Sequence, residues 1–384
     1  MSIALDGIKI LDLSTQLPGP YSSMLLADLG AEVIKIEQST GGDFSRMLAP
    51  FFQKTNRNKK SLTLNLKSQE GKEIFYKLAK TADVILEGFR PGVTQNLNID
   101  YNRIKEINPQ IIYCSLTGYG QNGPYKLRPG HDINYLGVTG AYDPEDNLEE
   151  ESVVTSIQIA DICGSMFSIV GILSSILMRE KTGKGQFVDV SMTDGISSWM
   201  STSVLSYISK LGFKIQKGEG PMLPHYGFFK TKDEKYLTLA IIHEDHFWKN
   251  FCKALELDDM VRYDLMKRVT KREKIHTTLK SIFLTKNRDE WIDILDAHDI
   301  PFGPVISSEE VLNNPHFLER NLISEIDDPI DGKIKHINFP VKFSEMPVEI
   351  KTPAPKLGQH TEEILYDIGY SEEEIVALKE GKII

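Results

Sequence analysis

The first 120 residues alternate short apolar runs with stretches of helical periodicity, and this alternation limits the possible folds more than any other feature. The apolar runs are rich in β-branched residues and end at turn residues, which is typical of strands. Strands that are apolar throughout are buried on both faces, as in a mostly parallel sheet covered by helices. The pattern therefore predicts an α/β, Rossmann-like fold. Strands are predicted at Ile8–Ser14, Ala31–Glu37, Asp83–Phe89 and Ile111–Thr117, and helices at Pro20–Gly30, Gln69–Ala82 and Tyr101–Asn108.

The second half of the chain contains further elements and a division into domains. Asp161–Glu180 is apolar on nearly all sides and predicts a long buried helix, and Phe187–Gly195 predicts another strand. Two short helices are expected at Thr361–Asp367 and Ser371–Lys379. The 384 residues exceed the usual size of one domain. We assign 1–200 to a large α/β domain, 201–225 to a linker, 226–325 to a small αβ domain and 326–384 to a C-terminal segment.

The charge and the cysteine content exclude several classes of protein. A net charge of −10 argues against nucleic acid as the main partner, because binding to phosphate backbones requires a positive surface. The three cysteines form no CxxC pair, which is typical of a reducing compartment. The N-terminus lacks the features of a secretory signal, and the apolar segment MFSIVGILSSILM is too short to span a bilayer. We expect a cytoplasmic protein without a membrane partner.

Two motifs match cofactor signatures only in part. GYGQNG (Gly118–Gly123) follows a strand, but Pro124 and the residues after it do not begin a helix. A dinucleotide site needs that helix, so a plain glycine turn is the better interpretation. In HEDH (His243–His246) the two histidines are three positions apart, whereas one helix face presents ligands four apart to zinc. We expect a loop or a helix N-terminus there, and no metal site.

Two further groups of polar residues each allow two interpretations. Asn56–Lys60, with Arg46 and Lys35, is either a solvated basic surface or a phosphate-binding segment of the first βα layer. His131 and Asp161, thirty positions apart, are either a loop histidine and a helix N-cap, or two proton-transfer groups that converge beside a helix N-terminus.

Several motifs in order resemble the class III CoA-transferase superfamily (CaiB/BaiF). They are LDLSTQLPGPYSSMLLADLGAEVIKIE, DVILEGFRPGV, SLTGYGQNGPY, GHDINY, IADICGSM and EKTGKGQFVDVSM. The resemblance runs from about Leu5 to Ser198 and resumes more weakly near the C-terminus. GHDINY resembles the α-methylacyl-CoA racemase branch in particular, and the segment near IIHEDHF lacks the glycine-rich lid of the transferases.

The resemblance implies an architecture and a ligand. The large α/β domain would receive the returning C-terminal segment, the smaller domain would be α+β, and two protomers would form an interlocked homodimer. The ligand would be an acyl-CoA thioester, with no metal and no cofactor beyond the CoA of the substrate. The family often places a CoA-binding arginine at the position of Gln38, so Lys35, Arg46 or Lys60 is expected to replace it.

The resemblance also assigns site residues. His131 and Asp161 would be the two acid/base groups, and Glu244 would pair with the histidine. The expected CoA-binding residues are Lys35, Arg46, Leu64, Asn65, Leu66, Lys67, Glu87, Arg90, Gly130, Asp132, Ile133, Asn134 and Tyr135.

Three functions follow from these assignments. The first is racemisation of a 2-methylacyl-CoA by 1,1-proton transfer through an enolate, with N–H groups of the turn after Asp161 stabilising the oxyanion. A buried pocket would raise the pKa of Asp161 and suit it to proton transfer. The second is CoA transfer between carboxylic acids with Asp161 as nucleophile, and the third is non-catalytic acyl-CoA binding.

Overall fold

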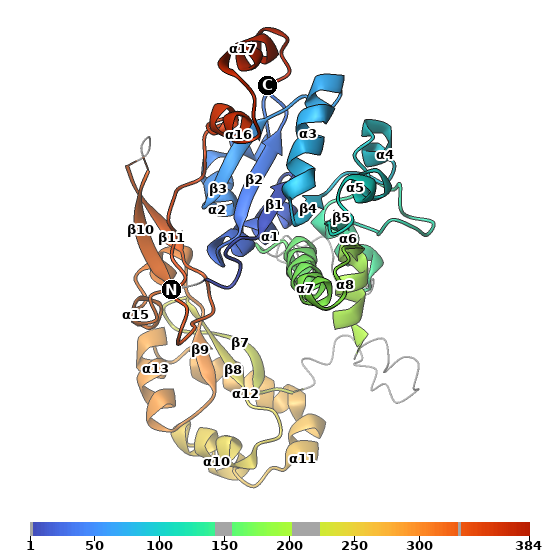
Figure 1. The fold of residues 1–384 in the computed structure, drawn as a ribbon. Helices are drawn as coiled ribbons and strands as arrows, with labels where there is room; N and C mark the ends of the chain where they lie inside the picture. The colour runs from blue at the N-terminus through green and yellow to red at the C-terminus, as the bar shows by residue number, and fades with distance from the viewer. Residues whose placement is uncertain (1–2, 143–155, 202–222, 329–331) are drawn as a thin grey trace. The chain divides into compact units, whose positions relative to one another are not determined.

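The computed structural model describes residues 3–142, 156–201, 223–328 and 332–384 (Figure 1). The chain divides into two compact units, one formed by residues 1–205 and 319–384 and the other by 206–318. The domain boundaries expected from the sequence lie near 200, 225 and 325. Most of the expected linker, and the acidic stretch before Asp161, lie outside the described residues.

The first unit is built on six parallel strands in the order β3-β2-β1-β4-β5-β6. This is the strand order of a doubly wound dinucleotide-type sheet, so the predicted α/β class with a mostly parallel sheet is confirmed. Strand β3 was not among the predicted strands, because it begins with two lysines. The strands are β1 Lys9–Asp12, β2 Glu32–Glu37, β3 Lys59–Thr63, β4 Val84–Glu87, β5 Ile112–Thr117 and β6 Gln186–Ser191.

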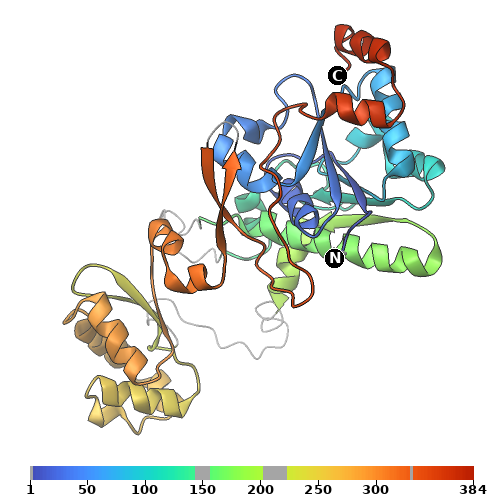
Figure 2. The ribbon, with the colours of Figure 1, turned by 60° about the vertical axis from the view of Figure 1, so that its left-hand side comes forward.

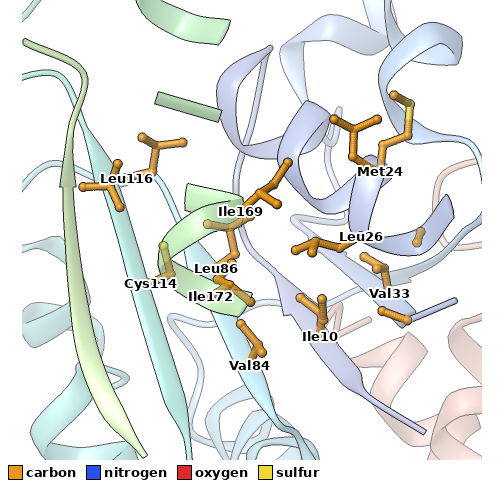
Figure 3. Packing of buried hydrophobic residues seen from close by; sticks show 14 of the residues in the cluster. Ile10, Met24, Leu26, Val33, Val84, Leu86, Cys114, Leu116, Ile169 and Ile172 are labelled. Carbon is orange, nitrogen blue, oxygen red and sulfur yellow. The ribbon is translucent and has the colours of Figure 1, made fainter. Parts of the chain in front are cut away.

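Helices cover both faces of this sheet (Figure 2). On one face α1 and α7 pack against alternate strand residues, and Figure 3 shows Ile169 and Ile172 of α7 beside strand residues such as Leu86. On the other face α3, α5 and α16 pack against the intervening residues, such as Ile85. The helices of this unit are α1 Pro18–Asp28, η1 Phe44–Met47, α2 Ala49–Asn56, α3 Gln69–Thr81, α4 Val93–Leu97, α5 Tyr101–Ile107, α6 Asp132–Val138, α7 Ile159–Thr182, α8 Met192–Trp199, α16 Thr361–Asp367 and α17 Glu372–Glu380.

Helix α7 extends beyond MFSIVGILSSILM, the apolar segment that was expected to be too short to span a bilayer. Its 24 residues include a window of mean hydropathy 1.8, so by length and composition alone it resembles a membrane span. Half of that window is buried inside the protein, where the helix covers the sheet. Its buried face therefore accounts for much of its apolar character. Exposed apolar residues occupy the opposite side, namely Met166, Phe167, Val170, Leu177 and Met178.

The C-terminal segment covers the β3 edge of the sheet. The His360 N–H donates to the carbonyl of Ser61 at 3.0 Å, and the Ser61 N–H donates to His360 Nδ1 at 3.1 Å. Further along, the Asn65 N–H donates to the carbonyl of Ile383 at 2.7 Å. The antiparallel strands β10 (Ile323–Asp328) and β11 (Gly332–Ile337) belong to the same unit.

The second unit combines a small antiparallel sheet with helices, which confirms the predicted α+β class. Its three strands pair in the order β7-β8-β9, and its core is rich in aromatic residues, including Trp248, Phe251 and Trp291. The elements are β7 Tyr226–Lys230, β8 Tyr236–Ala240, α10 Asp245–Ala254, η3 Asp258–Met260, α11 Leu265–Thr270, α12 Arg272–Phe283, α13 Arg288–Ala297, β9 Phe302–Pro304 and α14 Ser308–Leu312, and α15 Pro315–Glu319 follows at the boundary.

Candidate active site

A cavity of about 510 Å³ lies at the carboxyl ends of the parallel strands. Its walls include Ser14–Gln16 after β1, Gly88–Pro91 after β4, Thr117–Tyr119 at the end of β5, and Met192 after β6. Strands β1 and β4 are neighbours in the sheet, and the strand order reverses between them. Open parallel sheets bind their ligands at this position, because the loops there diverge and leave a crevice.

His131 and Asp161 both line this cavity. His131 immediately precedes α6, and Asp161 is the third residue of α7. The two helices are joined by Asp132, whose Oδ1 accepts the N–H groups of Ala160 at 2.7 Å and Asp161 at 3.2 Å. Asp132 thus supplies the cap that the residue before α7 does not provide, and it fixes the two helix starts to each other.

The carboxyl group of Asp161 has an unusual electrostatic environment. Burial raises its pKa, the negative charge of Asp132 raises it further, and the pKa reaches about 7. Near neutral pH both the carboxylate and the carboxylic acid are therefore present. A carboxylate of this kind is more basic and more nucleophilic than an ordinary aspartate.

The N–H groups expected to stabilise an oxyanion are not available, and this prediction was wrong. The N–H of Ile162 donates to the carbonyl of Gln158 at 3.0 Å, as a regular helix requires. The N–H of Asp161 itself points to Asp132. The expectation failed because α7 begins two residues before Asp161, so the turn after it is already inside the helix.

The segment before α6 is held by its own residues. The His131 N–H donates to Asn134 Oδ1 at 2.9 Å, and the Tyr135 hydroxyl donates to the carbonyl of Gly130 at 2.5 Å. Burial, followed by the charge of Asp161, raises the pKa of Tyr135 to about 12, which keeps its hydroxyl neutral. The imidazole of His131 is exposed at the cavity and can reach a ligand.

Four of the residues expected to bind CoA line the cavity, namely Arg90, Gly130, Asn134 and Tyr135. Of their neighbours, Asp132 caps α7 and Ile133 is exposed without lining the cavity. Lys126 and Arg128 also line the cavity, although neither was among the predicted site residues. Both precede GHDINY in the same loop, so the motif already pointed to their vicinity.

Lys35 and Arg46, the two basic residues expected to meet phosphates, are placed elsewhere, which corrects that expectation. Lys35 is fully buried, and its Nζ lies 2.9 Å from the carboxylate of Asp43. Arg46 donates to both carboxylate oxygens of Glu37 at 2.7 Å. Each cation is paired with a carboxylate of the protein, and neither lines the cavity. Lys60 is at the surface, where it pairs with Glu363 at 2.7 Å.

The remaining expected CoA contacts also lie away from the cavity lining. Leu64–Lys67 follows β3, and the Leu64 N–H donates to the carbonyl of Glu37 at 2.7 Å. Glu87 is buried and accepts hydrogen bonds from the hydroxyl of Ser115 and from the Phe89 N–H. Burial raises the pKa of Glu87 to about 7. Its carboxyl group supports the loop that carries Arg90.

Glu244 belongs to the second unit, where it precedes α10. Its Oε2 accepts the N–H of Ile242 at 2.9 Å. The HEDH segment is thus the start of a helix, one of the two structures expected there. The pairing of Glu244 with His131 stays a prediction.

The family model for CoA-transferase family III matches residues 5–361. The chain belongs to this family. A crystal structure of a CaiB/BaiF family protein from Brucella suis superposes with a TM-score of 0.84 at 29% identity, covering 96% of this chain and 100% of that one.

Three curated relatives of this family III chain match over nearly its full length. Human succinyl-CoA:glutarate CoA-transferase is 32% identical, over 95% of this chain and 86% of its own. Formyl-CoA:oxalate CoA-transferase of Escherichia coli is 30% identical, over 100% of both chains. An acyl-CoA transferase of Fusarium pseudograminearum is 35% identical, over 99% of this chain and 88% of its own.

Proposed function

We propose that this family III protein transfers CoA from an acyl-CoA to a second carboxylic acid, with Asp161 as the nucleophile. The observation that carries the proposal is the carboxyl group of Asp161 in the cavity, with a pKa raised to about 7. The relatives described above, which match nearly the whole chain, are named as CoA-transferases. They favour transfer over the racemisation expected from the sequence.

In the first half of the proposed reaction, the carboxylate of Asp161 attacks the thioester carbonyl. The C–S bond breaks, CoA leaves as a thiolate, and a mixed anhydride links the acyl group to the aspartate. The thiolate then attacks the aspartyl carbonyl of this anhydride. The first acid leaves as a carboxylate, and CoA remains on Asp161 as a thioester.

In the second half, the carboxylate of the acceptor acid attacks this aspartyl thioester. CoA thiolate leaves again, and a second mixed anhydride forms. The thiolate attacks the acceptor's own carbonyl, which yields the new acyl-CoA and restores the carboxylate of Asp161. Atoms and charges balance without an oxidant, a metal or a water molecule.

The charges of the cavity fit the ligands of this reaction. Arg90, Lys126 and Arg128 line it, and among the described residues none of the three forms an ion pair. CoA carries several phosphate charges, and the acids carry carboxylates, so both ligands need cations. Tyr125 supports this cluster, because the guanidinium of Arg128 lies 3.9 Å from its ring centre.

Racemisation remains a second candidate because His131 shares the cavity with Asp161. Inversion at the α-carbon needs one base on each face of a planar enolate. The carboxyl group of Asp161, with a pKa raised to about 7, is suited to one of these roles, and the imidazole of His131 lines the same cavity and would take the other.

One experiment separates the two candidates. The protein is incubated in D₂O with succinyl-CoA and glutarate, and in parallel with one enantiomer of 2-methylacyl-CoA. Formation of glutaryl-CoA without deuterium in the 2-methylacyl group supports transfer. Deuterium at Cα with loss of optical purity, and no transfer to glutarate, contradicts the proposal and supports racemisation. Asp161→Asn is the matched control, and it is expected to abolish either reaction.

A further inference from the structure

Gln16 has a strained backbone at the wall of the cavity. Its φ is 66°, in the left-handed region, where the Cβ of an L-residue approaches the following carbonyl. Glycine adopts this conformation freely, and asparagine or aspartate adopts it more readily than glutamine. Strained residues persist only where the surrounding structure holds them, and they concentrate at functional sites.

A buried ion pair holds Gln16 in this conformation. Both carboxylate oxygens of Asp43 accept the Gln16 N–H, at 3.1 and 3.2 Å. The ammonium of Lys35 lies 2.9 Å from Asp43 and donates to the carbonyl of Ser14 at 2.8 Å. The pair therefore bonds the backbone on both sides of Thr15. Both charged groups are almost completely buried, with exposures of 0% for Lys35 and 1% for Asp43.

A second buried ion pair fixes the two ends of the same loop. Asp12 accepts the N–H of Ser14 at 2.9 Å, and the ammonium of Lys59 lies 3.1 Å from Asp12. Lys59 also donates to the carbonyl of Pro20 at 2.9 Å. The loop from Ser14 to Pro20 is thus bonded to β1, β2 and β3 through charged groups that water does not reach.

The loop is also joined to the helix that carries Asp161. The hydroxyl of Ser165 is 2.7 Å from the carbonyl of Pro18 and 2.9 Å from that of Asp161. The wall that contains Gln16 and the helix turn that contains Asp161 therefore share a hydrogen-bonding group. Gln16 itself is exposed, and no described residue bonds its side-chain amide.

We propose that Gln16 is a ligand-contacting residue whose side-chain amide hydrogen-bonds the pantetheine arm of CoA. A thioester that reaches Asp161 places the arm next to it inside the cavity that both residues line. The arm is neutral and contains amide groups, each with one donor and one acceptor, and a glutamine amide offers both. Lys35 and Asp43 are positioning residues for this contact. The identity of the ligand rests on the CoA-transferase function proposed above.

Two variants separate the backbone strain from the contact. Gln16→Gly removes both the amide and the strain, whereas Gln16→Ala removes the amide and keeps the strain. The dissociation constant for CoA is measured by calorimetry, and the melting temperature is measured without ligand. Lys382→Gly is the control, because Lys382 has a φ of 55° in the same unit and does not line the cavity.

Both Gln16 variants are expected to bind CoA about fivefold more weakly, as the loss of one neutral hydrogen bond predicts. Gln16→Gly is expected to raise the melting temperature by about 2 °C, and Gln16→Ala is not. The control is expected to bind CoA like the wild type. Wild-type affinity in both Gln16 variants, or weaker binding in Gln16→Gly alone, overturns the contact. A wild-type protein that does not bind CoA overturns the proposed function together with this contact.

Discussion

The carboxylate of Asp132 lies at the start of helix α7, where its Oδ1 accepts the backbone N–H of Asp161 at 3.2 Å. Asp132 therefore has two effects. It caps α7, and its charge raises the pKa of Asp161 beyond the effect of burial. The helix dipole favours ionised Asp161, but burial and Asp132 outweigh it.

The charge of Asp132 is testable through the pH dependence of the reaction. The nucleophile must be ionised, so kcat/KM for transfer is expected to rise with pH through about 7 and to be lost below it. Asp132→Asn keeps an oxygen that can cap α7 but removes the negative charge. Its pH profile is therefore expected to shift to lower pH with a similar plateau. An unshifted profile would show that Asp132 does not act on the pKa of Asp161.

The proposed role of the cavity cations in binding CoA can be tested by measuring the affinity for CoA in variants of Arg90 and Lys126. Arg90→Gln and Lys126→Gln are each expected to weaken CoA binding by about tenfold, because each loses a charge-assisted hydrogen bond. The salt dependence of binding is expected to fall in both variants. Lys60→Gln is the control, since Lys60 is paired with Glu363 outside the cavity. Equal losses in all three variants would mean that only the net charge of the protein matters.

The contribution of the buried pair of Lys35 and Asp43 to folding can be tested by measuring the free energy of unfolding. Burial raises the pKa of Asp43, but Lys35 and the neighbouring N–H groups outweigh it and hold that pKa below its usual value. Lys35→Met leaves this charge buried without its partner, at a cost of about 3–5 kcal/mol in the free energy of unfolding. Lys60→Met removes a partly exposed pair and is expected to cost at most about 1 kcal/mol. Denaturant unfolding of both variants measures the difference. A small loss in Lys35→Met would mean that Asp43 has another partner or is protonated.

The role of the exposed apolar side of α7 as a dimer contact can be tested by measuring the oligomeric state. The family resemblance predicts a homodimer, and exposed residues such as Val170 and Leu177 provide an apolar surface that a second copy would cover. Light scattering coupled to gel filtration is expected to report a dimer. Val170→Glu is expected to weaken the dimer, whereas Glu180→Gln, at the end of the same helix, is not. A monomeric wild-type protein would contradict the prediction.

The large elements of the fold were predictable because their periodicity is local. The helix expected at Thr361–Asp367 has those bounds in the structure, and the strands β1, β2, β4 and β5 lie within the predicted ranges. Strand β3 was missed because its first residues are Lys59 and Lys60. The charge of the buried Lys59 is neutralised by Asp12, 47 positions earlier, and local sequence does not reveal such a partner.

The sequence located the two central residues of the site but not the partners of its basic residues. The motif around His131 and the start of α7 identified two residues that line one cavity. Lys35 and Arg46 were expected beside phosphates but pair with carboxylates outside the cavity lining. A basic residue near a strand end looks the same in the sequence whether its partner is a phosphate or a buried carboxylate. The partners are Asp43 for Lys35 and Glu37 for Arg46. These pairs form only in the folded chain, so the sequence does not reveal them.

The most direct test of the central claim is to trap the enzyme-bound intermediate on Asp161. The protein is incubated with succinyl-CoA, treated with hydroxylamine, digested and analysed by mass spectrometry. A hydroxamate at Asp161, absent from Asp161→Asn and from the protein without succinyl-CoA, is the predicted result. Transfer to glutarate by a wild-type protein that yields no hydroxamate at Asp161, or by Asp161→Asn at an undiminished rate, would contradict the account.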